Sequence, residues 1–120
     1  MVKKFTLALG LVLLGVGLWG ASTGGHDHNL IIFGINMNHN VVHILSGLLA
    51  IVTALASRRA AKWYCISFGS VYGLVAIAGF FQMGRAVTLL NLNAADNFLH
   101  LSIALACLYF GFTARTFIEV

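Results

Sequence analysis

Four long apolar stretches, separated by short polar segments, dominate the chain. They run over residues 5–21, 41–56, 63–83 and 98–113, and none contains Asp, Glu, Lys or Arg. Because the apolar positions are continuous and do not alternate with polar ones, the pattern predicts helices rather than strands. A bilayer core about 30 Å thick needs about 20 helical residues, so the shorter stretches must recruit flanking residues to cross it.

The composition indicates that lipid surrounds most of the chain. Of its 120 residues, 60% are hydrophobic and only 8% are charged, a balance that a water-soluble domain of this size could not support. We therefore predict an all-α integral membrane protein, an antiparallel bundle of four transmembrane helices that forms one domain over residues 1–120. The lipid bilayer is its first expected partner.

The basic residues predict how the chain crosses the membrane. Six of the seven Lys and Arg residues lie near the two termini or in segment 57–62, and Arg85 is alone on the other side. Because cytoplasmic loops are enriched in basic residues, we place both termini and residues 57–62 in the cytoplasm, and loops 22–39 and 84–96 outside. The expected location is the bacterial inner membrane. Because the basic residues lie beside the ends of the predicted spans, they do not form a surface for nucleic acid.

The two halves of the chain share a polar pattern. A shift of 57 positions aligns, without a gap, Asn36, Asn40 and His43 with Asn93, Asn97 and His100. Three polar residues in register indicate two helical hairpins related by duplication, with repeat one at about residues 1–57 and repeat two at about residues 58–120. The pseudo-twofold axis then lies along the membrane normal, and we expect His43 and His100 at similar depth.

The same residues carry a family resemblance. The second apolar stretch opens with Asn-x-x-His from Asn40 to His43, and the fourth opens with Asp-Asn-x-x-His from Asp96 to His100. In this pattern, and over nearly its whole length, the chain resembles the bacterial membrane proteins grouped as domain of unknown function 4383. The resemblance implies a four-span fold and brings no established activity. The loop that contains His26 is not part of the family's pattern.

Asn40 and Asn97 are expected to cap their helices. Each comes directly before an apolar stretch, where an asparagine side chain can accept the orphan amide hydrogens of a first helical turn. Asp96, beside the second cap, suits the positive end of the helix dipole. His43 and His100 then follow three residues after each cap, within reach of it.

His43 and His100 are also candidate cofactor ligands. If the two imidazoles meet near the repeat axis, they can hold a metal ion, a haem or the magnesium of chlorophyll. All five histidines fall on the outer side in this topology, and His26, His28 and His39 are candidate ligands for a metal such as zinc, copper or nickel. His39 precedes His43 by one helical turn, which places both on one face. The alternative for His26 and His28 is a solvated, glycine-rich loop.

Small residues predict where the helices approach one another. Gly47 in the second stretch, and Gly69 and Gly73 in the third, suit the close backbone contacts that helices make in lipid. Cys65 and Cys107 are expected at different depths, as small buried hydrophobes without a disulfide. The apolar segment 30–35 is too short to cross and is expected to lie along the outer interface or to dip partway in.

The chain shows no sequence signal of an enzyme. It offers no nucleophile with its base, no phosphate-binding loop and no paired carboxylates. We expect a non-enzymatic accessory or scaffold subunit that packs in a larger membrane complex or forms a homo-oligomer. One alternative is a protein that binds a metal, haem or chlorophyll at the outer face. Another is a small carrier or lipid-binding module with a polar mouth between the two hairpins.

Overall fold

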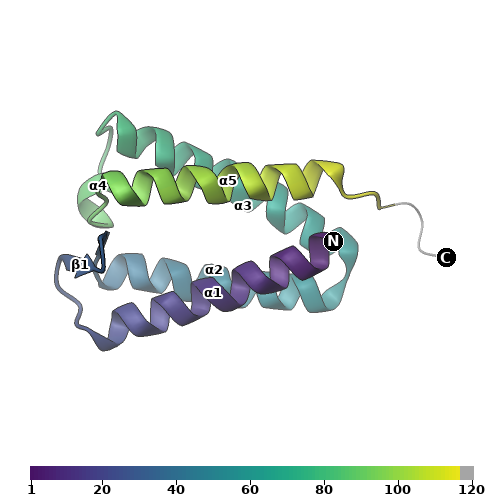
Figure 1. Cartoon of the computed structure of the whole chain (residues 1–120), viewed down its shortest axis with the longest axis horizontal. Coiled ribbons are helices and arrows are strands. Elements are labelled where there is room, and N and C mark those ends of the chain that lie inside the picture. Colours follow the sequence, from purple (N-terminus) through teal and green to yellow (C-terminus); the bar gives the residue numbers. More distant parts are fainter. Residues whose placement is uncertain (117–120) are drawn as a thin grey trace.

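The computed structural model describes residues 1–116, and within them four helices are long and apolar enough to cross a membrane. Figure 1 shows these helices, which are α1 (Val2–Ser22), α2 (Met37–Ala56), α3 (Arg58–Phe80) and α5 (Ala94–Thr113). The prediction of a mostly helical membrane protein with four apolar spans is confirmed. Glu119 and the carboxyl terminus lie outside the described residues.

A single residue, Ser57, connects α2 to α3. Its extended backbone ends α2, and its hydroxyl accepts a hydrogen bond from the amide of Ala60 at 3.0 Å, which caps α3. Residues 58–62, which separate the second and third predicted apolar stretches, therefore form the first turns of α3. The third helix begins earlier than its apolar stretch because the serine cap precedes the charged residues.

The helices form two antiparallel pairs, α1 with α2 and α3 with α5 (Figure 1). Small residues set the spacing within each pair. A β-carbon on Gly47 would lie 2.6 Å from the backbone nitrogen of Leu14, and one on Gly69 would lie 3.0 Å from Cβ of Cys107. Gly73 differs, because a β-carbon there would meet Cβ of Ala104 at an ordinary 3.7 Å. Gly47 and Gly69 are therefore the glycines of the predicted set that hold backbones close.

The two pairs meet at the end of the molecule where α1 begins and Ser57 makes its turn, which we call the turn end. There the hydroxyl of Thr6 lies 3.1 Å from Sγ of Cys65, and the Phe5 and Phe110 rings stack at 4.4 Å. Cys65 and Cys107 belong to the same buried cluster. The expectation that they lie at different depths was wrong, because α3 begins at Arg58 and carries Cys65 two turns into the helix.

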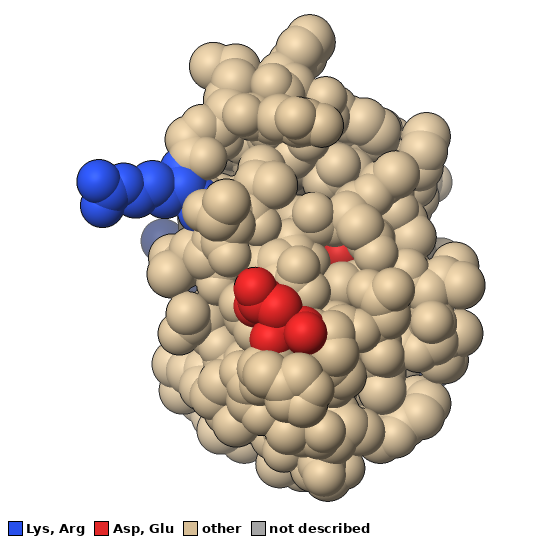
Figure 2. All heavy atoms as spheres, turned by 90° about the vertical axis from the view of Figure 1, so that its left-hand side faces the viewer, with Lys and Arg blue, Asp and Glu red and all other residues tan. Residues whose placement is uncertain are grey.

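The opposite end, which we call the hairpin end, is covered by the two long connections. Strand β1 (His28–Leu30) pairs antiparallel with β2 (Phe33–Ile35), and the tip residues Ile31 and Ile32 are exposed. The connection between α3 and α5 contains the short helix α4 (Ala86–Leu89). Seen from this end, most of the surface is uncharged, with an acidic side chain exposed near the middle of the face and a basic side chain projecting at its edge (Figure 2).

Asparagine side chains tie the two connections together. The Asn91 amide donates to the carbonyl of His28 at 3.2 Å and to that of Ile35 at 3.0 Å. The Asn93 amide donates to the carbonyl of Ile32 at 2.9 Å. In the other direction, the Asn36 amide donates to the carbonyl of Leu89 at 2.8 Å. These bonds satisfy backbone groups that lipid could not.

Candidate metal centre

The N-termini of α2 and α5 are capped by Asn36 and Asn93. The Asn36 side chain accepts the amide hydrogen of His39 at 2.9 Å, and the Asn93 side chain accepts that of Asp96 at 3.0 Å. The prediction that Asn40 and Asn97 are the caps was therefore wrong. Two asparagines stand one turn apart in each half, and each helix begins at the earlier one. In α2 this follows because β2 holds the chain extended up to Ile35.

Asp96 closes a capping box and also holds the β-hairpin. Its carboxylate accepts hydrogen bonds from the amide of Asn93 at 2.8 Å and from the amide of Gly34 at 3.0 Å. A β-carbon on Gly34 would overlap the carbonyl of Asn91. A glycine at this position therefore allows the hairpin to approach the start of α5.

Asn40 and Asn97 pack against glycines of the neighbouring helix. Asn40 lies against Gly20 of α1, and Asn97 lies against Gly79 of α3, so closely that a β-carbon on either glycine would overlap the amide oxygen. Both asparagines are buried, and neither amide oxygen has a hydrogen-bond partner. Each helix pair therefore contains the same asparagine–glycine contact, at equivalent positions.

Three histidines form a buried cluster at the hairpin end. His39 and His43 come from successive turns of α2, and His100 comes from α5 of the other pair; their exposed fractions are 1%, 6% and 3%. The ring centroids lie 4.4 Å apart for His39 and His43, 5.5 Å for His39 and His100, and 6.4 Å for His43 and His100. One nitrogen from each ring lies within 4.8 Å of the others. The cluster thus bridges the two helix pairs.

Several nitrogens of this cluster have no hydrogen-bond partner. They are both ring nitrogens of His39 and the Nδ1 atoms of His43 and His100. The backbone of Gly34 and of Leu90 faces the His39 ring, but no contact there has hydrogen-bond geometry. Buried polar atoms are nearly always paired, because an unpaired one costs about 1–3 kcal/mol. Each of the three rings therefore has at least one nitrogen without a partner, as suits a shared ligand.

The donor set fits a transition-metal ion. Tetrahedral zinc has bonds to nitrogen of about 2.0–2.1 Å, which places its ligand atoms about 3.3 Å apart. Nitrogens within 4.8 Å reach that spacing by small side-chain rotations. Three histidines with one open position are also a known zinc arrangement. Among the described residues, no carboxylate belongs to the cluster.

His26 and His28 lie outside this cluster. Their rings stack at 4.5 Å, and Nε2 of His28 lies 2.8 Å from the hydroxyl of Thr23. The structure thus places His39 with His43 and His100, and not with the two loop histidines. The spacing of His39 and His43 by one turn was the sequence signal for this arrangement.

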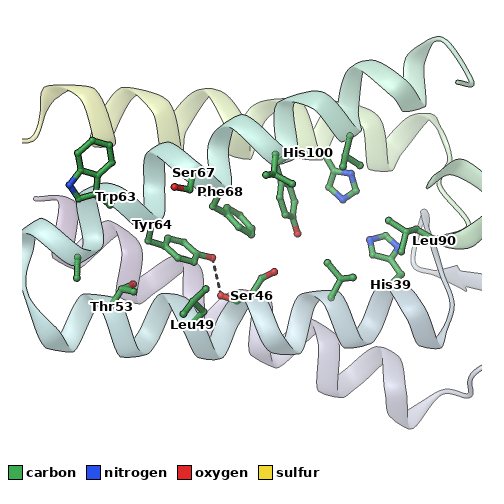
Figure 3. Close-up of a pocket in the computed structure, with 15 residues that line it drawn as sticks. His39, Ser46, Leu49, Thr53, Trp63, Tyr64, Ser67, Phe68, Leu90 and His100 are labelled. Carbon is green, nitrogen blue, oxygen red and sulfur yellow. Dashed lines mark hydrogen bonds between the residues drawn. The ribbon is translucent and has the colours of Figure 1, made fainter. Parts of the chain in front are cut away.

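A cavity of about 520 Å³ begins at the cluster and extends between α2 and α3. Figure 3 shows His39 and His100 facing each other from opposite sides at one end, with Trp63 and Thr53 at the other. The Tyr64 hydroxyl donates to the carbonyl of Ser46 at 2.9 Å across the cavity. The size of this space depends on how far the two helix pairs separate, which no sequence pattern encodes.

The fold and the cluster together define a four-span membrane protein with three buried histidines at one end. The model of the family described as Domain of unknown function (DUF4383) matches residues 3–113. The chain belongs to this family, which confirms the resemblance seen in its Asn-x-x-His patterns. No curated protein and no solved structure matches the chain significantly.

Proposed function

We propose that this protein binds a transition-metal ion through His39, His43 and His100. One observation carries the proposal: three buried imidazoles from both helix pairs bring one nitrogen each within 4.8 Å of one another, and every ring has at least one nitrogen without a partner. A metal ion would satisfy them together. It would also link α2 to α5, and so hold the two pairs together at the hairpin end.

Zinc and copper are the ions that the ligands favour. Imidazole suits both, whereas oxygen ligands would be needed for magnesium or calcium. Three neutral imidazoles do not cancel the charge of the ion, and a buried net charge is costly. Monovalent copper leaves the smaller charge, and divalent zinc has the three-histidine arrangement as precedent. Loading with each ion separately decides between them.

The site would lie near the outer surface of the membrane. Lys3, Lys4, Arg58, Arg59 and Lys62 are all at the turn end, at the beginning of α1 or of α3. Basic residues favour the cytoplasmic side, which supports a cytoplasmic turn end. The hairpin end, with the histidine cluster, then faces outward. An ion can reach it there without crossing the bilayer.

The other sequence-based hypotheses stay predictions. They are the accessory or scaffold subunit, the homo-oligomer, the binding of haem or chlorophyll, and the small carrier or lipid-binding module. The apolar side chains exposed along all four spans are expected for helices in lipid. They therefore do not distinguish a partner protein from the bilayer.

The proposal is tested by metal content. The purified protein is loaded with Zn²⁺ or with Cu⁺ under reducing conditions, passed through a desalting column and analysed by mass spectrometry for bound metal. We expect about one equivalent of one ion. A His43→Ala, His100→Ala double variant should lose it, while a His26→Ala, His28→Ala control should keep it.

Two results would overturn the proposal. One is a correctly folded wild-type protein that retains neither ion. The other is metal that stays bound in the double variant but is lost in the loop control. An absorption spectrum of the protein isolated from its native membrane distinguishes a third case, because a Soret band would indicate haem.

A further inference from the structure

The cavity between α2 and α3 has a polar end and an apolar body. His39 and His100 lie at its polar end, and Tyr72 lines it beside them, with the Tyr72 and His100 rings 5.0 Å apart. The Tyr72 side chain is 94% buried, yet its hydroxyl has no hydrogen-bond partner. The Tyr64 hydroxyl farther along is already bonded to Ser46. The fully buried side-chain atoms of the lining that have no partner therefore lie at one end.

One wall of the cavity is aromatic. Tyr64, Phe68 and Tyr72 follow one another at successive turns of α3, with ring centroids 4.9 Å and 4.1 Å apart. Trp63 extends this surface toward the turn end (Figure 3). Rows of rings favour contact with a flat, apolar group. The opposite wall is formed by α2, with small or aliphatic side chains such as Val42 and Leu49.

None of the residues that line the cavity is Asp, Glu, Lys or Arg. An anionic head such as phosphate or carboxylate would find no cation to pair with and would pay for its desolvation. A plain hydrocarbon chain would fill the body but leave the Tyr72 hydroxyl unpaired, at further cost. The suitable ligand is uncharged, with hydrogen-bond acceptors at one end and an apolar remainder.

We propose that this cavity binds a lipid-soluble quinone, with its ring at the end formed by Tyr72, His39 and His100 and its tail toward Trp63. A quinone carbonyl accepts a hydrogen bond from the Tyr72 hydroxyl, and the flat ring lies against the aromatic wall. The cavity volume of about 520 Å³ is in the range of small-molecule sites. The ring end of this site adjoins the proposed metal site, because His39 and His100 belong to both, but the hydrogen bond to the quinone comes from Tyr72, which is not a metal ligand.

Fluorescence of Trp63 provides the test. The chain has two tryptophans, so a Trp19→Phe variant leaves Trp63, at the cavity, as the reporter. Decylubiquinone is titrated into this variant in lipid nanodiscs. We expect saturable quenching. A Trp63→Phe variant, which reports from Trp19 on α1 and outside the cavity lining, should show only the gradual quenching that follows partition of the quinone into lipid.

Two further substitutions, each made in the Trp19→Phe variant, locate the site. Tyr72→Phe keeps the ring and removes the hydroxyl, and should weaken binding about five- to tenfold, as expected for one lost hydrogen bond. The matched control, Tyr109→Phe, changes an exposed tyrosine of α5 and should leave affinity unchanged. Ser67→Phe, which fills the cavity from α3, should abolish saturable quenching.

Several results would overturn the proposal. They are equal quenching of Trp63 and Trp19, unchanged affinity in both Tyr72→Phe and Ser67→Phe, or displacement of the quinone by dodecanol at equal concentration. Displacement by dodecanol would indicate that the cavity accepts any hydrocarbon chain and does not recognise the quinone ring. Titration after treatment with a metal chelator separates the two proposals, because quinone affinity should persist when metal has been removed.

Discussion

His39 and Asp96 occupy the same position in two helix N-termini, three residues after the asparagine that caps each helix. Asp96 turns its carboxylate back to the amide of Asn93 and completes a capping box. His39 instead extends its ring into the histidine cluster. This equivalence supports the proposal that residues 1–57 and 58–120 are repeats. Under the proposed metal binding, one repeat uses this position for stability and the other for ligand binding.

A His39→Gln substitution should separate these two uses. Glutamine suits the third position of a helix, where it can reach back to the capping residue. We expect the metal-free protein to change in stability by less than about 1 kcal/mol, because the unpaired imidazole contributes little. Metal affinity should fall at least tenfold. Thermal unfolding in detergent, with and without the ion, measures both. A large loss of stability without metal would show that His39 is structural.

The two glycines that face buried asparagines should not tolerate a methyl group. Gly20→Ala and Gly79→Ala would each drive a β-carbon into the amide of Asn40 or Asn97. We expect each to destabilise the protein by about 1–3 kcal/mol, as for other overpacked cores. Gly15→Ala is the matched control, since nothing lies within 4 Å of its β-carbon, and it should be neutral or stabilising. Equal effects at all three positions would contradict this packing.

Asp96→Asn should loosen the hairpin end. The substitution replaces a carboxylate that accepts from Asn93 and Gly34 with an amide that accepts more weakly. We expect a loss of about 1–2 kcal/mol in unfolding free energy, together with faster hydrogen exchange in the β-hairpin. Asp27→Asn, at an exposed carboxylate that contacts Asn36, is the control and should have little effect. Unchanged exchange at Gly34 in Asp96→Asn would contradict the role of this carboxylate.

The apolar pattern alone predicted the four spans, because lipid requires long, uncharged helices. It did not predict their starts. In α2 and α5 the polar residues before each stretch already belong to the helix, since Asn36 and Asn93 provide caps one turn earlier. The short β-hairpin was also missed, because segment 30–35 is apolar throughout and has no turn signal such as Asn-Gly.

The candidate site was predicted in part. The shared register drew attention to His43 and His100, and helical spacing placed His39 on the face of His43. That His39 completes the group depends on the angle at which α2 meets α5, which no local pattern encodes. The Cys65–Cys107 contact and the cavity were missed for the same reason. They arise between helix pairs, where packing and not periodicity determines the geometry.

The orientation of the chain is tested by labelling. Ile32→Cys places a thiol at the exposed hairpin tip, and Arg59→Cys places one at the turn end, while both native thiols are buried. A membrane-impermeant maleimide added to intact cells should label Ile32→Cys and leave Arg59→Cys unlabelled until the cells are lysed. The reverse pattern would place the histidine cluster at the cytoplasmic side.

X-ray absorption at the metal edge of the loaded protein counts the imidazole ligands of the ion. We expect three imidazole nitrogens at about 2.0–2.1 Å if the ion is zinc, and two in a His100→Ala variant. A spectrum without imidazole scattering, or one that His39→Gln and His100→Ala leave unchanged, would contradict a metal site formed by His39, His43 and His100.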